Sequence, residues 1–312
     1  MMSFADSLLS HVQNKGNPCL IGLDYHEGRL PDFVRNDLAR NPSPEGYRAA
    51  LSGFFRRIIA AVAPLVPAVK PQISLLESMT WVGAQVFMDV VAAAREHGLV
   101  VIADAKRGDI ASSAVGYAKA FLGGAEGPDF AQGYRADAMT VNPFLGRDTL
   151  DPYLDACRAL GKGVFVLVRT SNKGSVETQN IEVGDSRTPM FAVYARMVDE
   201  IGASLIGEKG YSSVGAVVGA TFPDEASQLR ALMPRAIFLV PGYGAQGATA
   251  DDVARNFNAD GLGAIVNASR SVTYGFERSD ISPGAYDRTV RDNVLRMAGD
   301  IAKGIERRLR RE

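Results

Sequence analysis

Eight short apolar runs, separated by longer amphipathic stretches, constrain the fold of this chain more than any other feature. The runs are rich in Val, Ile and Leu and apolar on both faces, which is typical of parallel strands buried beneath helices. Regular alternation of such strands with helices predicts an α/β fold, a (β/α)8 TIM barrel, in a single domain over residues 1–312. The predicted strands are Cys19–Asp24, Val69–Ile73, Leu99–Lys106, Ala138–Asn142, Gly163–Ser171, Val214–Thr221, Ala236–Pro241 and Gly263–Ser269.

Helical patterns fill the stretches between these runs. One pattern covers Thr80–His97, Thr249 and Asp252 predict a capping box, and a basic helix is expected over Asp287–Arg311. The Gly/Ser/Thr-rich segment Asn172–Pro189 is predicted to be a mobile loop. The alternative fold is an open doubly wound sheet, but no GxGxxG follows the first strand, which counts against a dinucleotide-binding sheet.

Composition narrows the class of protein. The chain has 312 residues, 46% hydrophobic, and a net charge of −1, so nothing indicates a nucleic-acid partner. No apolar run approaches the ~20 residues that span a membrane, and the N-terminal segment does not resemble a signal peptide. Cys19 and Cys157 read as buried thiols, which fits a reducing cytoplasm. The three histidines are scattered, so we expect no metal site.

Polar side chains follow the apolar runs where the strands end, the edge at which barrels place their active sites. These residues are Asp24, Lys70, Asp104, Lys106, Asn142, Ser171, Gln246, Asn267 and Arg270. Each taken alone has an ordinary explanation as a cap, a turn or a surface charge. Their joint occurrence at nearly every strand end instead predicts one polar site.

The densest charge cluster is the run from Asp104 to Asp109. Alternate side chains of a strand share a face, so Asp104 and Lys106 should project together. Two carboxylates beside an ammonium at the end of a buried strand are costly unless the site uses them. The spacing alone is equally compatible with a surface ion pair.

The residues that follow the seventh and eighth predicted strands indicate a phosphate-binding site. Barrels often bind phosphate with the loops after strands seven and eight. The Gly-rich segment Pro241–Gly247 offers backbone N–H donors, Gln246 a side-chain donor, and Arg270 a forked cation.

Together these residues resemble the orotidine 5′-phosphate decarboxylase family, in particular its longer bacterial group. The resemblance rests on Asp104-x-Lys106-x-x-Asp109 and on Lys70 one strand earlier, and it covers nearly the whole chain in order. Supporting segments are Ile21-Gly22-Leu23-Asp24, Val69-Lys70-Pro71-Gln72, Thr140-Val141-Asn142-Pro143-Phe144, Arg169-Thr170-Ser171-Asn172 and Pro241-Gly242-Tyr243-Gly244-Ala245-Gln246-Gly247.

The resemblance implies a cofactor-free enzyme that converts orotidine 5′-monophosphate to UMP and CO2, the final step of de novo UMP synthesis. It implies a cytoplasmic homodimer with shared sites, in which Asp109 reaches the partner's site. In the roles that it implies, Lys106 donates the proton, Asp104 faces the substrate carboxylate, and Lys70 and Asp109 complete the charge network. Asp24 and Lys70 contact the ribose, and Ser171 contacts the pyrimidine edge. Gln246 and Arg270 bind the phosphate, and Ser113 and Asn142 also contact the substrate.

Three other functions remain open on the sequence. A metal-dependent sugar-phosphate decarboxylase or synthase of the same barrel superfamily shares the D-x-K-x-x-D element, although Lys70 would repel a cation. A Schiff-base aldolase would use Lys70 or Lys106, but flanking carboxylates favour the charged form of a lysine. A non-catalytic nucleotide-binding protein is the third.

Overall fold

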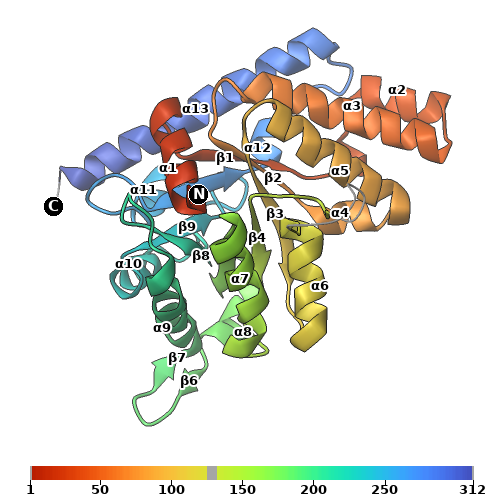
Figure 1. The fold of residues 1–312 in the computed structure, drawn as a ribbon. Coiled ribbons are helices and arrows are strands. Elements are labelled where there is room, and N and C mark those ends of the chain that lie inside the picture. The colour runs from red at the N-terminus through yellow and green to blue at the C-terminus, as the bar shows by residue number, and fades with distance from the viewer. Residues whose placement is uncertain (1, 125–131, 311–312) are drawn as a thin grey trace.

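The computed structural model describes residues 2–124 and 132–310. Eight parallel strands close into a barrel in the order β1-β10-β9-β8-β5-β4-β3-β2, which confirms the (β/α)8 prediction and rules out the open sheet. The helices surround the strands (Figure 1). The barrel strands are β1 Cys19–Leu23, β2 Ala68–Pro71, β3 Val100–Arg107, β4 Ala138–Val141, β5 Gly163–Arg169, β8 Ser212–Val218, β9 Ala236–Val240 and β10 Ala264–Ala268.

Two groups of helices can be separated by their place in the chain. Those before β5 are α1 Phe4–Lys15, α2 Asp32–Arg40, α3 Pro44–Val62, α4 Ile73–Glu77, α5 Thr80–Glu96, α6 Ala111–Leu122 and α7 Asp151–Leu160. Those after it are α8 Val176–Gln179, α9 Met190–Gly202, α10 Pro223–Leu232, α11 Ala250–Ala254, α12 Arg270–Thr273 and α13 Pro283–Leu309. Short 3-10 helices lie at Glu27–Arg29, Arg147–Leu150, Lys173–Ser175 and Ala203–Leu205.

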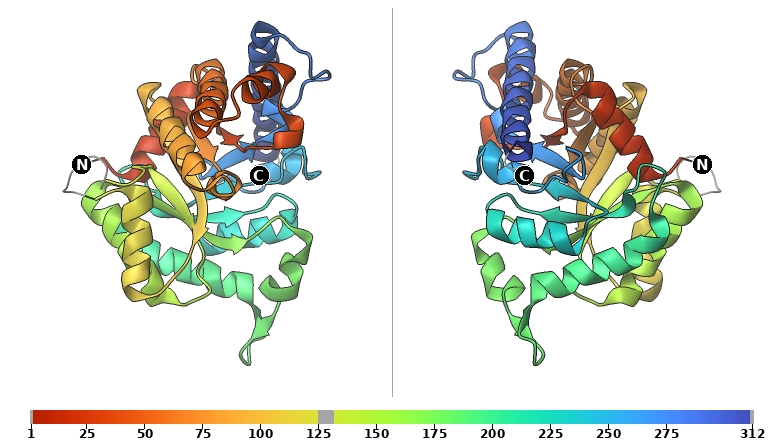
Figure 2. Two further views of the ribbon diagram at one scale, coloured as in Figure 1. Left: turned by 90° about the vertical axis from the view of Figure 1, so that its right-hand side faces the viewer. Right: turned by 90° about the vertical axis from the view of Figure 1, so that its left-hand side faces the viewer.

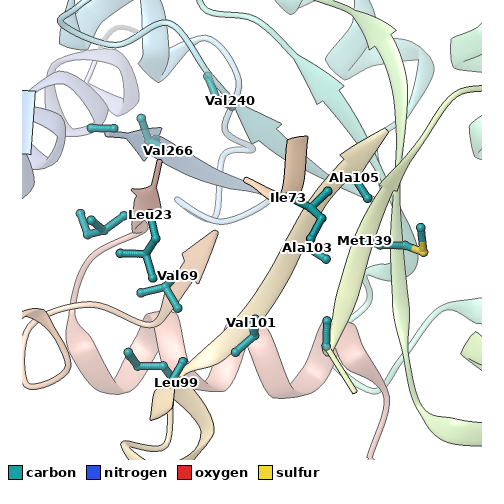
Figure 3. Close-up of a cluster of buried hydrophobic side chains, with 14 of the residues drawn as sticks. Leu23, Val69, Ile73, Leu99, Val101, Ala103, Ala105, Met139, Val240 and Val266 are labelled. Carbon is teal, nitrogen blue, oxygen red and sulfur yellow. The ribbon is translucent and has the colours of Figure 1, made fainter. Parts of the chain in front are cut away.

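The period-two alternation of the strands divides the apolar side chains between two cores. Val101, Ala103 and Met139 belong to the layer between barrel and helices, part of which Figure 3 shows. Val100 and Ile102 belong to the barrel interior instead. Asp104 and Lys106 continue this inward-facing series on β3, so they extend the interior toward the carboxyl end of the strand.

Helix α1 fills the opposite, amino-terminal end of the barrel. Its residues Phe4, Leu8 and Leu9 are buried with the interior cluster, and Phe4 meets Phe165 edge to face, with ring centroids 5.8 Å apart. A Cβ on Gly163 would lie 2.1 Å from the Phe4 ring, so only glycine fits there. Because this end is plugged, the interior is open only at the carboxyl ends of the strands.

Several predicted boundaries shift for local reasons. The second strand ends at Pro71, before the predicted Ile73, because Gln72 caps α4 through its side-chain oxygen and the Ser74 N–H, 3.3 Å away. The last helix starts at Pro283, because Ser282 accepts from the Ala285 N–H as an N-cap. Its predicted final residue, number 311, lies outside the described residues.

Other predictions held more closely. The helix expected over Thr80–His97 covers Thr80–Glu96, and the capping box of Thr249 and Asp252 is present with both reciprocal hydrogen bonds. Both views of Figure 2 place α13 beside α3 at one end of the molecule, while the hairpin of β6 Glu182–Val183 and β7 Thr188–Pro189 projects at the other. Within residues 2–124 and 132–310, no helix is both long and apolar enough to cross a membrane.

Candidate active site

A cavity of about 730 Å³ lies at the carboxyl ends of the strands, where the sequence predicts the site. Seven of the ten predicted site residues line it: Asp24, Lys70, Asp104, Lys106, Asn142, Ser171 and Gln246. Because these residues come from six different strands or the loops that follow them, the closed barrel is what brings them together.

The floor of the cavity is an alternating charge array. The Lys70 ammonium lies 2.5 Å from Asp104 Oδ2, and the Lys106 ammonium pairs with the other carboxylate oxygen, Asp104 Oδ1. The Lys70 and Asp104 side chains are 6% and 9% exposed, whereas that of Lys106 is 46% exposed. Lys70 is therefore a buried counter-charge, and Lys106 presents its ammonium to the cavity.

Burial and neighbouring charges shift the pKa values of Asp104 and Lys70 in opposite directions. Burial alone would raise the pKa of Asp104, but the ammonium groups of Lys70 and Lys106 outweigh it and hold that pKa below its usual range. Burial alone would lower the pKa of Lys70, but Asp104 and then Asp24 outweigh it and raise that pKa. Both groups therefore stay charged at neutral pH.

Unpaired polar atoms mark the rim beside β1 and β10. Among the described residues, Asp24 Oδ1 and Asn267 Oδ1 are buried without a hydrogen-bond partner, although both residues line the cavity. A Cβ on Gly22 would lie 3.2 Å from Asn267 Oδ1 and 2.8 Å from Ser269 Cβ, so glycine lets β10 approach this closely. Buried oxygens left unpaired in this way are placed to accept hydrogen bonds from a bound ligand.

The segment from Asn172 to Pro189 differs from the long loop that the sequence predicts. It contains the 3-10 helix Lys173–Ser175, helix α8, and the antiparallel pair β6 Glu182–Val183 and β7 Thr188–Pro189. Its residues Asn172, Thr178, Gln179 and Ile181 line the cavity. The segment therefore forms one wall of the site.

A buried arginine, to which the sequence assigned no role, anchors this wall. Arg169 is fully buried; its Nε donates to Glu225 on α10, and its Nη1 donates to Ser175 Oγ at 2.6 Å and to Gln179 Oε1 at 3.1 Å. Gln179 in turn accepts from the Thr170 N–H at 2.9 Å. The elements of this segment are too short to carry a periodic signal, so only the folded structure shows that Gln179 reaches the cavity.

Three predicted site residues do not line the cavity of this single chain. Asp109 is half-buried, and its Oδ1 accepts from the N–H of Ile110. Ser113 is exposed on α6, and Arg270 is exposed as the first residue of α12. Asp109 and Ser113 thus lie beyond the site that the other seven residues form.

A charged array at the floor of a cavity, at the open end of a parallel eight-stranded barrel, defines an enzyme of the TIM-barrel class. Residues 22–275 match the model of the "Orotidine 5'-phosphate decarboxylase / HUMPS family", and the chain belongs to this family. The resemblance inferred from the sequence is thereby confirmed.

Relatives with this name are similar over most of their length. The orotidine 5'-phosphate decarboxylase of Rhodopirellula baltica is 41% identical over 294 residues, covering 94% of this chain and 96% of that protein. The Deinococcus radiodurans protein of the same name is 45% identical over 273 residues, covering 87% and 89%. The structure of Leishmania donovani OMP decarboxylase is similar with a TM-score of 0.72 and 28% identity, covering 97% of this chain and 99% of that one.

Proposed function

We propose that this chain decarboxylates orotidine 5′-monophosphate to UMP and CO2, the last step of UMP synthesis, without metal or organic cofactor. The observation that carries the proposal is the Lys70–Asp104–Lys106 array at the floor of the cavity, in a chain of this family. We further propose that the whole chain is one domain and that it acts in the cytoplasm, where its two buried, unpaired cysteines would stay reduced.

The reaction breaks the bond between C6 of the pyrimidine and the carboxylate carbon. CO2 leaves, and the electron pair stays on C6 in an orbital that no neighbouring group can delocalise. The Lys106 ammonium stabilises this charge, transfers a proton to C6 to give UMP, and regains a proton from solvent. Such fixed charges act most strongly in a partly dehydrated site, where they need no reorganisation during the reaction.

Asp104 and Lys70 set up this step. In the proposed complex the Asp104 carboxylate faces the substrate carboxylate, and the repulsion is relieved when CO2 departs. Lys70 keeps Asp104 ionised through the 2.5 Å contact and, with Asp24, reaches the ribose. Because Lys70 is buried, it also places a positive charge where a divalent cation would otherwise bind among these carboxylates.

The rest of the substrate would extend along the cavity. Ser171, packed against Gly219 and next to the Arg169 anchor, is assigned to the pyrimidine edge, and Asn142 to a substrate contact. Gln246 lies at the rim in the Gly-rich loop after β9, and Arg270 begins α12 after β10; we assign both to the phosphate.

A spectrophotometric assay of orotidylate decarboxylation tests the function. We expect turnover that is unchanged in excess EDTA, since no step requires a metal. Orotidine, which lacks the phosphate, should react with kcat/KM lower by roughly 10²–10⁶-fold, because two or three charged hydrogen bonds of about 1.5–3 kcal/mol each would be lost. Loss of activity in EDTA would favour the metal-dependent alternative, and no turnover at all would refute the proposal.

We also propose a homodimer in which Asp109 and Ser113 contribute to the partner's site. Both residues lie outside the cavity of their own chain. Ile110 and Val115, close to them in sequence, are 59% and 54% exposed, and Phe144 after β4 is 79% exposed. Such an exposed apolar patch is typical of an interface. Phe144 lines the cavity, so this patch begins at the mouth of the site.

Mixing two inactive variants tests the shared site. Lys106→Ala and Asp109→Ala subunits, co-expressed so that they pair at random, should recover about one quarter of the wild-type activity, because half of the dimers then hold one intact site of two. Each variant alone should be inactive. No recovery in purified heterodimers would place Asp109 in the site of its own subunit.

A further inference from the structure

The ladder between β3 and β4 is interrupted where the charge array begins. Two successive pairs, Ala103 with Met139 and Arg107 with Val141, enclose three residues of β3 but only Thr140 of β4. Two residues of β3 are thus extra, and the regular carbonyl acceptors of β4 cannot serve the N–H groups of this bulge.

The Thr140 hydroxyl replaces those acceptors. Its Oγ1 accepts from the N–H groups of Ala105, at 3.0 Å, and Lys106, at 2.9 Å. The same hydroxyl donates to Asp104 Oδ1, 3.1 Å away. Thr140 is 1% exposed, so water cannot easily substitute for it. One buried oxygen atom therefore uses all its hydrogen-bonding capacity on the three residues of the bulge.

The bulge holds Lys106 in an unusual backbone conformation. Its φ is +48°, in the left-handed region that few residues other than glycine adopt. A conformation of this kind persists where surrounding contacts fix it, and such residues cluster at functional sites. Here the hydrogen bond from the Lys106 N–H to Thr140 is the contact that fixes it.

We propose that Thr140 is a positioning residue for catalysis: its hydroxyl locks the β3 bulge and orients Asp104, so that the Asp104 and Lys106 side chains are fixed before substrate binds. This inference rests on the proposed decarboxylase function. It assigns to Thr140 no contact with the reacting atoms. The expected consequence is an effect on kcat rather than on substrate binding, because the distance from Lys106 to C6 matters most in the transition state.

Thr140→Val and Thr140→Ser separate the hydroxyl from the shape of the side chain. The valine variant keeps the shape and loses the hydroxyl, and we expect kcat for orotidylate to fall about 10–100-fold. The serine variant keeps the hydroxyl and should stay within about threefold of wild type. In both, KM for orotidylate and Kd for UMP should change less than about threefold. A valine variant with wild-type kcat, or a serine variant impaired as much as valine, would overturn the proposal.

A matched control and a second measurement keep the result interpretable. Thr149 is also a buried threonine, but its hydroxyl donates to the Gly146 carbonyl away from the cavity, so Thr149→Val should leave kcat unchanged. Hydrogen exchange of the Ala105 and Lys106 amides should accelerate in Thr140→Val and not in Thr140→Ser. If the valine variant does not fold, Thr140→Ala carries the same comparison with serine.

The exchange measurement does not depend on activity. Accelerated exchange with no turnover even in the wild-type protein would refute the decarboxylase function while leaving the structural role of Thr140 intact. Wild-type turnover together with unchanged exchange in Thr140→Val would refute the positioning role alone.

Discussion

Lys106→Ala is expected to lower kcat for orotidylate by at least about 10⁴-fold. Loss of a general acid alone costs ~10²–10⁴-fold, and removal of the charge that stabilises the developing carbanion costs further orders of magnitude. The variant should still bind UMP, because the assigned ribose and phosphate contacts remain. The measurement is the rate of orotidylate decarboxylation at saturating substrate, with UMP affinity determined separately.

The same substitution should leave stability nearly unchanged. The Lys106 side chain is 46% exposed, and Asp104 keeps the Lys70 ammonium and the Thr140 hydroxyl as partners when Lys106 is removed. Lys119→Ala, an exposed lysine on the neighbouring helix α6, is the control and should keep full activity. A Lys106→Ala variant that binds UMP and retains kcat within tenfold of wild type would exclude Lys106 as the proton donor.

The fold was predictable because its signal is repeated along the chain. Eight apolar runs at regular intervals specify buried parallel strands, and closure then places every strand end at one mouth. This is why Asp24, Lys70 and Gln246, which are far apart in sequence, could be assigned to one cavity before the structure was known. Boundaries were less predictable, since Gln72 and Ser282 act through single caps.

The supporting contacts of the site were not predictable in the same way. Thr140 reads as an ordinary strand residue, and its role depends on a two-residue offset between β3 and β4 that no periodicity encodes. Arg169 and Gln179 meet through a segment of very short elements, which carry no periodic signal either. Asp109 and Ser113 lie outside the cavity, so their predicted role in a partner's site depends on a surface that one chain cannot complete.

Asp104 links the chemistry to the stability of the barrel. Within residues 2–124 and 132–310, its carboxylate is the only group that forms a hydrogen bond or ion pair with the buried Lys70 ammonium, at 2.5 Å. Asp104→Asn therefore removes the carboxylate that pairs directly with this buried charge, which typically costs about 3–5 kcal/mol of unfolding free energy. Urea denaturation at pH 7 measures this loss as a lower midpoint with an unchanged m value.

Removing both charges separates stability from catalysis. Lys70→Met combined with Asp104→Asn should regain much of the lost stability, because the uncompensated charge is gone, yet it should remain inactive. Asp89→Asn is the matched control: its partner Arg48 is exposed, so about 1 kcal/mol or less should be lost. A double variant as unstable as Asp104→Asn would show that the carboxylate stabilises the barrel by contacts other than Lys70.

The pH dependence of the unfolding free energy that Asp104→Asn loses follows from the direction of each pKa shift. The Asp104 pKa is lowered in the folded protein, so its stabilising contribution is present above the unfolded value of about 3.9 and is lost as the pH falls through the folded value. The Lys70 pKa is raised, so its contribution is present below about 10.4 and is lost only as the pH rises through the folded value. In Asp104→Asn, burial without that carboxylate lowers the Lys70 pKa instead, so the variant gains stability as the pH rises toward about 10.4. The stability difference between wild type and Asp104→Asn should therefore shrink as the pH rises toward about 10 and shrink again in acid below about pH 4. A difference that stayed constant up to about pH 10 would show that Lys70 keeps its charge without Asp104, so that another group compensates it.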